Sequence, residues 1–257
     1  MSAVPSTFAA AGVLMRRSIY EVLRVPGAAI PGILAPSIFM LGLTAVFGNL
    51  TELRGFGTSE YLAFILPVSL MQAASFSGAA TGVNLARDIE QGWFDRMLVA
   101  PIPRWLLLGS IVASASLRSL LPITGTLMVA FIFGVDFPGV GPLLLALALS
   151  VLFASVAAAW ASALALRFKT QSAAPLMQAS MFMLVLFTPS YAPQELLTGF
   201  LQDVARWNPV SQVVEAVRTC FVTSVTWAET WPALVVIAGL AVLFGAMALR
   251  GLARTGD

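Results

Sequence analysis

The sequence lacks histidine altogether and contains a single cysteine, Cys220. Without histidine, the chain has no histidine-based acid–base catalysis, no serine triad that needs it and no zinc site of the usual kind. One cysteine excludes an intramolecular disulfide and a multi-cysteine metal site. Charged residues are also scarce, at 10% of the chain where soluble domains carry roughly 25%. The net charge of +2 is too small to indicate a nucleic-acid partner.

Apolar residues are what the sequence has in abundance, at 59%. Several apolar runs reach about 20 residues, the length a helix needs to cross a hydrocarbon core about 30 Å thick. The composition therefore predicts an all-α integral membrane protein with one transmembrane domain, 28–257, preceded by a cytoplasmic amphipathic segment, 1–27. Within it we expect six transmembrane helices, of which the fifth is short and contains Pro175, at 28–47, 61–83, 106–133, 143–166, 173–187 and 231–249.

The arginines and the one lysine predict the orientation. Ten of them fall in the N-terminal segment, the loops after the second and fourth spans, and the C-terminus, whereas three fall in the remaining loops. Because cytoplasmic loops carry the excess of positive charge, we expect both termini in the cytoplasm.

Two segments outside the spans have amphipathic patterns. Residues 1–27 predict an interfacial helix that ends at Pro26, and a charged flank of the first span is the alternative. The stretch 188–230 predicts two short external helices that dip into the outer leaflet, with a hinge at Asn208 and Pro209. One re-entrant segment, shielded by protein, is the alternative.

The sequence has no evident source of energy for transport. Lys169 is the only lysine and has no glycine-rich phosphate loop around it, so we expect no nucleotide, metal or other cofactor on this chain. All twelve acidic residues fall in predicted loops or tails, which argues against a carrier driven by protons or sodium. The same lack of buried carboxylates and histidine argues against a membrane-embedded enzyme.

The segment 87–104, RDIEQGWFDRMLVAPIPR, interrupts the apolar runs after the second span. Ile89, Trp93 and Met97 repeat every four residues, and Pro101 ends the pattern, which predicts a short amphipathic helix. Such a helix suits either a groove in a cytosolic protein or the lipid interface. Its carboxylates favour the protein, because anionic lipids prefer a more basic polar face.

Around this segment the sequence resembles the ABC-2 type export permeases, close to the daunorubicin-resistance-like branch of bacteria. The resemblance depends on the motif ARDIEQGWFDRMLVAPIPRWLLLGS and, more weakly, on WNPVSQVVEAVR, and it covers nearly the whole chain. The motif residues are Glu90, Gly92, Phe94, Asp95, Arg96, Pro101 and Gly109. Ser110 stands where the family often has lysine.

The resemblance implies a permease subunit in the bacterial cytoplasmic membrane that exports a hydrophobic or amphipathic drug or lipid. It implies two cytosolic ATPase subunits that use ATP and magnesium, a second or sister permease, and lipid contacts. The helix after the second span would then be the coupling helix, with a contact set of Asp88, Glu90, Gln91, Gly92, Trp93, Phe94, Asp95, Arg96 and Pro101. An ion-coupled carrier, or a membrane scaffold without an ATPase, is the alternative.

A few polar residues in the predicted spans are candidates for a translocation path or gate. Arg118 either lies deep in the third span or, as we expect, reaches the cytoplasmic interface because the span begins near Ala113. Gln72, Thr124 and Gln178 more often serve as hydrogen-bonding contacts between helices, and line a path less often. The small-residue runs 155–165 and 245–251 predict close helix contacts, within one subunit or between two.

Overall fold

The computed structural model describes residues 30–52, 58, 60–98, 103–190, 192–193 and 197–254. Over these residues the chain is helical, without a strand, as predicted. The elements are α2 (Ile30–Phe47), η2 (Gly48–Glu52), α3 (Tyr61–Glu90), α4 (Trp93–Leu98), α5 (Arg104–Ile132), α6 (Val140–Phe168), η3 (Gln171–Ala173), α7 (Ala174–Leu186), α8 (Phe200–Trp207), α9 (Val210–Val222) and α10 (Trp227–Ala253). The segment 1–27, for which we predicted an interfacial helix, lies outside the described residues.

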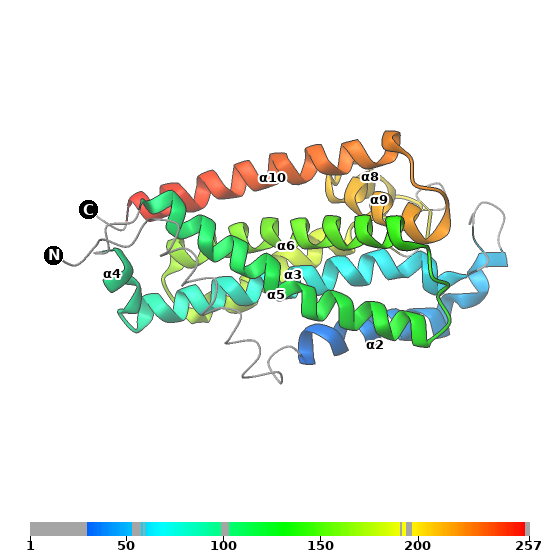
Figure 1. The fold of residues 1–257 in the computed structure, drawn as a ribbon, viewed down its shortest axis with the longest axis horizontal. Helices are drawn as coiled ribbons and strands as arrows, with labels where there is room; N and C mark the ends of the chain where they lie inside the picture. Colours follow the sequence, from blue (N-terminus) through cyan, green and yellow to red (C-terminus); the bar gives the residue numbers. More distant parts are fainter. Residues whose placement is uncertain are drawn as a thin grey trace.

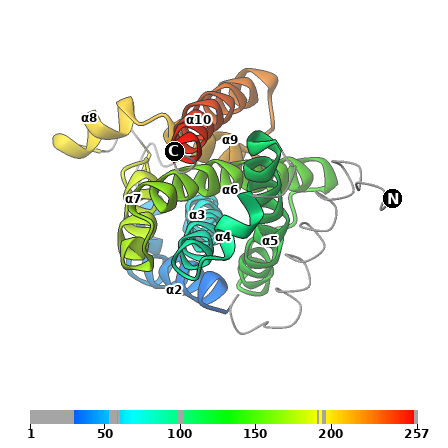
Figure 2. The same cartoon turned by 90° about the vertical axis from the view of Figure 1, so that its left-hand side faces the viewer.

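Helix α3 forms the centre of the bundle. It contacts α2, α5, α6, α7 and α9, and every residue from Tyr61 to Ser75 is buried. The other long helices surround it and run roughly along the same axis (Figures 1 and 2). This explains why the sequence of α3 has apolar or small residues on all sides rather than on one face.

Five helices are long and apolar enough to cross a membrane: Ile30–Thr51, Tyr61–Glu90, Arg104–Ile132, Val140–Phe168 and Trp227–Ala253. The fifth predicted span, 173–187, corresponds to α7, which has only 13 residues. At about 1.5 Å per residue α7 is about 20 Å long, less than the hydrocarbon core of about 30 Å. By length, five of the described helices can span a membrane, whereas we predicted six.

The close contact between α3 and α6 depends on two glycines. A Cβ atom added at Gly78 would lie 2.5 Å from the Cβ of Ala157, and one added at Gly82 would lie 2.5 Å from the Cβ of Ala161. Both glycines are four residues apart on one side of α3, where small residues let two helix backbones approach. The small-residue run 155–165 was predicted to form a close helix contact either within one subunit or between two. In the structure it forms one within the subunit.

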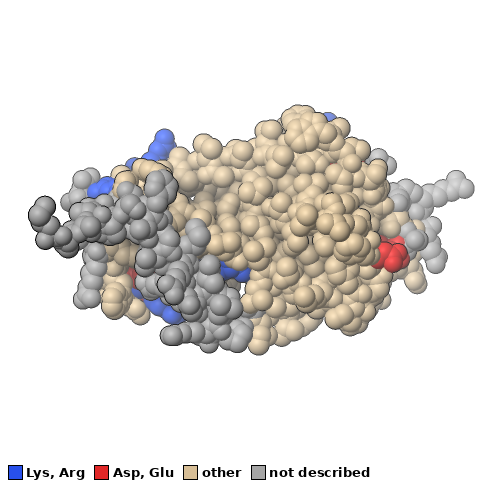
Figure 3. Space-filling model, viewed as in Figure 1, with Lys and Arg blue, Asp and Glu red and all other residues tan. Residues whose placement is uncertain are grey.

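The bundle has two ends that differ in their elements. The α4 end contains the end of α3, α4, the start of α5 and the end of α10, and the α9 end contains α8, α9 and the start of α10 (Figure 1). The basic residues in segments near the α4 end are Arg87, Arg104, Arg167, Lys169, Arg250 and Arg254. In Figure 3 the long side of the molecule is almost free of charge, and most basic atoms lie toward the α4 end.

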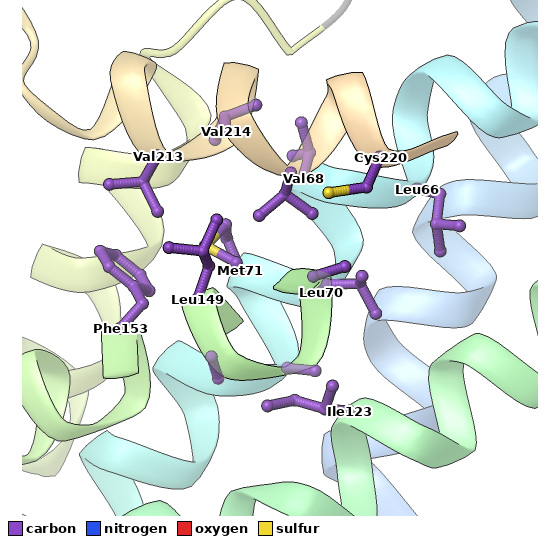
Figure 4. Close-up of a cluster of buried hydrophobic side chains, with 14 of the residues drawn as sticks. Leu66, Val68, Leu70, Met71, Ile123, Leu149, Phe153, Val213, Val214 and Cys220 are labelled. Carbon is purple, nitrogen blue, oxygen red and sulfur yellow. The ribbon is translucent and has the colours of Figure 1, made fainter. Parts of the chain in front are cut away.

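The apolar core near the α9 end includes α9 itself. Val213 of α9 points toward the side of the bundle where Leu149 and Phe153 of α6 lie (Figure 4), and Val214 belongs to the same apolar cluster. A second, smaller cluster, which includes Leu85, Leu107 and Leu166, joins the helices at the α4 end. Helix α9 at one end and helix α4 at the other are therefore attached to the bundle by packing.

Candidate coupling site

A turn at Gln91 and Gly92 separates α3 from α4. Gly92 has a φ of +70°, a left-handed conformation that glycine adopts without strain. The amides of Gln91 and Gly92 donate to the carbonyls of Arg87 and Ile89, which closes the end of α3. The predicted continuous helix is thus wrong in this respect: Asp88 to Glu90 complete α3, and α4 comprises only Trp93 to Leu98.

Helix α4 is attached to the bundle by Phe94. This side chain is only 1% exposed and belongs to the apolar cluster at the α4 end, against which Ile89 and Met97 also pack. Trp93, by contrast, is 55% exposed. The apolar stripe that we predicted for a partner is therefore divided, since Phe94 packs inside the chain and Trp93 lies on its surface.

Glu90 joins the last turn of α3 to the loop between α6 and α7. One carboxylate oxygen accepts hydrogen bonds from the Thr170 hydroxyl, at 2.7 Å, and from the Gln171 amide, at 3.0 Å. The other oxygen accepts from the Gln171 side-chain Nε2 at 2.7 Å. A carboxylate suits this role because both of its oxygens only accept.

The loop that Glu90 contacts is itself well defined. Lys169 ends α6 with a φ of 55°, and the Thr170 hydroxyl accepts from the Ser172 amide at 3.2 Å. Arg87 adds a long hydrogen bond of 3.5 Å from its Nε to the Gln171 side chain. Sequence reasoning missed Thr170 and Gln171, although the polar run after α6, KTQS, marks a loop.

The remaining residues of the predicted coupling set are distributed around the same turn. Asp88 is half-buried and Gln91 is exposed. Asp95 and Arg96 lie in α4 with side chains outside the described residues, and Pro101 lies outside them as a whole. The described members of the predicted set therefore lie at one end of the bundle, next to the loop after α6.

The four residues predicted for a path or gate have different surroundings. Gln72 is buried in α3 with its Nε2 lacking a hydrogen-bond partner, while Gln178 of α7 is exposed. The Thr124 hydroxyl donates to the Leu120 carbonyl of its own helix at 2.6 Å. These three positions do not form one cluster with a common chemistry.

Arg118 is the middle residue of α5, with 14 residues on each side of it in the helix. Its guanidinium donates to the Thr81 hydroxyl of α3 at 3.1 Å. The helix is continuous from Arg104 to Ile132. That the membrane-embedded part of this helix begins near Ala113 stays a prediction. By helical rise Arg118 lies about 21 Å from either end of α5.

At the α9 end, the corner between α8 and α9 falls at Asn208 and Pro209, where the hinge was predicted. The Asn208 side chain donates to the Leu184 carbonyl of α7 at 2.7 Å and accepts from the Val210 amide at 3.0 Å. Asparagine suits this corner because one side chain can both donate and cap the start of a helix. The corner is thus bonded to the end of α7.

Arg218 of α9 makes the second attachment at this end, a role that its place in the motif WNPVSQVVEAVR and among the external basic residues did not predict. It is 5% exposed and donates to the carbonyls of Phe64, at 3.2 Å, and Pro189, at 2.7 Å. Its guanidinium also pairs with Glu215 and lies 3.8 Å from the centre of the Phe64 ring. A buried charge of this kind needs such a complete set of partners.

Among the described residues, no group of three or more histidine, cysteine, aspartate or glutamate side chains could hold a metal ion. The polar groups at the α4 end instead join elements of the chain to one another. The chemistry available there is therefore that of a contact surface.

Comparisons with known proteins identify the family of the chain. A model of the ABC-2 type transporter family matches residues 10–222. The "Daunorubicin resistance ABC transporter permease protein DrrB1" of Streptomyces coeruleorubidus is 26% identical over 220 residues, 85% of this chain and 77% of that protein. The "Probable doxorubicin resistance ABC transporter permease protein DrrC" of Mycobacterium tuberculosis is 24% identical over 206 residues, 80% of this chain and 72% of that protein.

Proposed function

The chain belongs to the ABC-2 type transporter family, and from that premise we propose that it is the membrane-spanning subunit of an ATP-driven exporter. ATP would be hydrolysed by two cytosolic ATPase subunits, and a second permease would complete the complex. The cargo would be a hydrophobic or amphipathic compound, a drug or a lipid. Support comes from the relatives, which are named as drug-resistance ABC transporter permeases.

The observation that carries the proposal is the arrangement of Trp93 and Phe94. Phe94 holds α4 to the bundle, and the neighbouring Trp93 remains exposed at the end of the molecule where basic residues gather. A partly exposed tryptophan on an anchored helix is a suitable centre for a protein contact, because tryptophan is enriched among the residues that dominate interfaces.

Glu90 connects the proposed contact at α4 to other helices of the bundle. Its hydrogen bonds join the segment before α4 to the loop that precedes α7. Displacement of α4 by a partner would therefore act on α3 and α7 together. We propose Asp88, Gln91, Gly92, Asp95, Arg96 and Pro101 as further parts of this coupling surface, with Glu90 and Phe94 positioning it.

The orientation follows from the distribution of charge. Because the described basic residues gather at the α4 end, we place that end in the cytoplasm, with both termini on that side. This side is also where a cytosolic ATPase would dock. An ion-coupled carrier or a scaffold is the competing hypothesis. Co-purification of an ATPase distinguishes the exporter from both.

The test is to replace Trp93 by alanine in the chain co-expressed with an ABC ATPase that co-purifies with the unsubstituted chain. We expect the variant to insert and fold, and to lose co-purification of the ATPase and transport-stimulated ATP hydrolysis. Trp227→Ala is the matched control, since Trp227 is 71% exposed at the α9 end, and we expect it to keep both activities.

Normal assembly and coupling in the Trp93 variant would contradict the proposed contact. Uptake or export by the purified chain alone, driven by a sodium or proton gradient, would favour the ion-coupled carrier instead.

A further inference from the structure

Helix α8 lies apart from the bundle that the other helices form. It extends sideways at the α9 end, beyond α7 (Figure 2). Of its eight residues only Ala205 is buried, while Phe200 is 73% exposed and Trp207 is 84% exposed. Two large aromatic side chains at the ends of so short a helix need an explanation, because both expose apolar surface to the surroundings.

The sequence of α8 has three distinct sides rather than two. At 3.6 residues per turn, Leu201 and Ala205 lie above one another, and this side faces the bundle: Ala205 is buried and its carbonyl accepts from the Ser211 hydroxyl at 2.7 Å. On one flank of this side lie Phe200, Val204 and Trp207. On the other flank lie Gln202, Asp203 and Arg206.

A helix with protein on one side, an apolar flank and an opposite polar flank fits the boundary between lipid and water. The apolar flank would enter the acyl region while the polar flank stays hydrated. A helix in water would not be expected to concentrate phenylalanine and tryptophan on one exposed flank. A soluble partner protein would not require an apolar flank and a polar flank on the two sides of the contact between α8 and the bundle.

The surroundings of α8 agree with this boundary. The ring of Phe200 packs edge-on against the ring of Phe187, with 6.3 Å between the ring centres. The apolar flank therefore continues the surface of α7, on which Leu176 and Met183 are exposed. Further exposed aromatic residues lie near the same end of the bundle: Phe133, Phe137, Trp227 and Trp231. Aromatic side chains collect at membrane–water interfaces, so this end has the composition of an aromatic belt.

We propose that α8 lies in the plane of the membrane at the α9-side surface and binds phospholipid through Phe200, Val204 and Trp207. Gln202, Asp203 and Arg206 face the water. The helix is therefore interfacial, whereas α9, which we grouped with it as a helix dipping into the leaflet, is covered by protein. The proposal needs only that the chain spans a membrane, and it does not depend on an ATPase partner.

The single cysteine makes a site-directed test straightforward. In a Cys220→Ala background, one cysteine is introduced at Phe200, Val204, Gln202 or Arg206 and carries a nitroxide spin label in phosphatidylcholine bilayers. Collisions with oxygen, which concentrates in lipid, are compared with collisions with a water-soluble nickel chelate. Labels at Val242, exposed on α10, and at Asp136, exposed between α5 and α6, provide the lipid and water references.

We expect labels at Phe200 and Val204 to favour oxygen, as at Val242, and labels at Gln202 and Arg206 to favour nickel, as at Asp136. Nickel preference at all four positions would overturn the proposal, because α8 would then stand in water. Shielding of Phe200 and Val204 from both reagents would also overturn it, since a second protein chain would then cover the flank.

A second measurement keeps Cys220, so its result does not depend on whether the Cys220→Ala variant folds correctly. Trp207→Phe is compared with the unsubstituted protein in bilayers whose lipids carry bromine near the headgroup. We expect the variant to lose a lipid-quenched part of the tryptophan fluorescence. An unchanged quenched fraction would contradict the lipid contact of Trp207 independently of the spin labels.

Discussion

At each end of the bundle one charged side chain attaches a short element to its neighbours by hydrogen bonds. Glu90 lies at an exposed helix end and binds a loop 80 residues later in the sequence through three donors. Arg218 is buried and bonds α9 to α3 and to the segment after α7. The first is expected to determine geometry more than stability, because hydrogen bonds at an exposed site replace bonds to water and contribute little net free energy. The second is expected to contribute to stability as well.

Replacement of Glu90 by alanine should loosen the loop after α6, because all three of its donors lose their acceptor. Glu90→Gln should have an intermediate effect, since one carbonyl oxygen can keep Thr170 and the Gln171 amide while the new amide faces the Gln171 Nε2. The measurement is hydrogen–deuterium exchange of a peptide that contains Gln171. Exchange should be faster in the alanine variant and unchanged in Asp136→Asn, and full protection in the alanine variant would exclude the role assigned to Glu90.

Replacement of Arg218 by methionine should lower the free energy of unfolding by about 1–3 kcal/mol, because two buried carbonyls lose a charged donor. Glu215 is half-exposed and can be hydrated, so Glu215→Gln should cost less. Denaturant unfolding in detergent provides the measurement. Arg206→Met is the matched control on the exposed side of α8, and we expect its effect to stay within about 0.5 kcal/mol. Equal effects of the two arginine substitutions would show that the Arg218 contacts contribute no net stability.

At the scale of elements, apolar length predicted the five long helices, and turn chemistry predicted the corner between α8 and α9. The break before α4 was missed because Ile89, Trp93 and Met97 keep helical spacing across Gly92, and periodicity does not report the left-handed turn. The division between Phe94 and Trp93 was missed for a related reason. An apolar stripe is the same in sequence whether its own bundle or another protein covers it.

The contact between α3 and α6 provides a test at this scale. Gly82→Ala should lower the midpoint of thermal unfolding in detergent, because the added methyl would lie 2.6 Å from the Ala161 carbonyl oxygen and 2.5 Å from its Cβ. Overpacking of this kind costs about 1–3 kcal/mol. Gly239→Ala in α10 meets no atom within 4 Å and should be neutral or slightly stabilising, since alanine favours helix. A neutral Gly82 variant would mean that the two helices separate without cost.

At the scale of the molecule, composition and loop charge predicted a helical membrane protein and the gathering of basic residues at one end. The central position of α3 and the meeting of Glu90 with Thr170 and Gln171 could not be predicted. Hydropathy gives the length of each helix but not its neighbours, because lipid and protein are equally apolar surroundings. Such pairings across the bundle depend on the full three-dimensional packing.

Between α6 and α10 the chain passes from one end of the bundle to the other without a long helix among the described residues. Helix α6 ends at the α4 end and α10 begins at the α9 end (Figure 1), so the chain must change sides between them. Helix α7 covers about 20 Å of that distance. The described residues directly after it, 187–190, are not helical. There the hydroxyls of Thr188 and Ser190 both donate to the Val185 carbonyl, at 2.7 and 3.1 Å. Non-helical backbone is tolerated at membrane depth where protein satisfies its polar groups.

We therefore expect Lys169 and Asp203, on either side of α7, to face opposite sides of the membrane. In the Cys220→Ala background, Asp203→Cys should react with a membrane-impermeant maleimide in intact cells, and Lys169→Cys only after permeabilisation. Asp136→Cys and Arg254→Cys serve as matched controls near the α9 and α4 ends. Labelling of positions 169 and 203 from the same side, with the controls on opposite sides, would show that α7 does not cross. Because α10 would then have to begin on the wrong side of the bundle, that result would refute the arrangement of helices and not only the orientation.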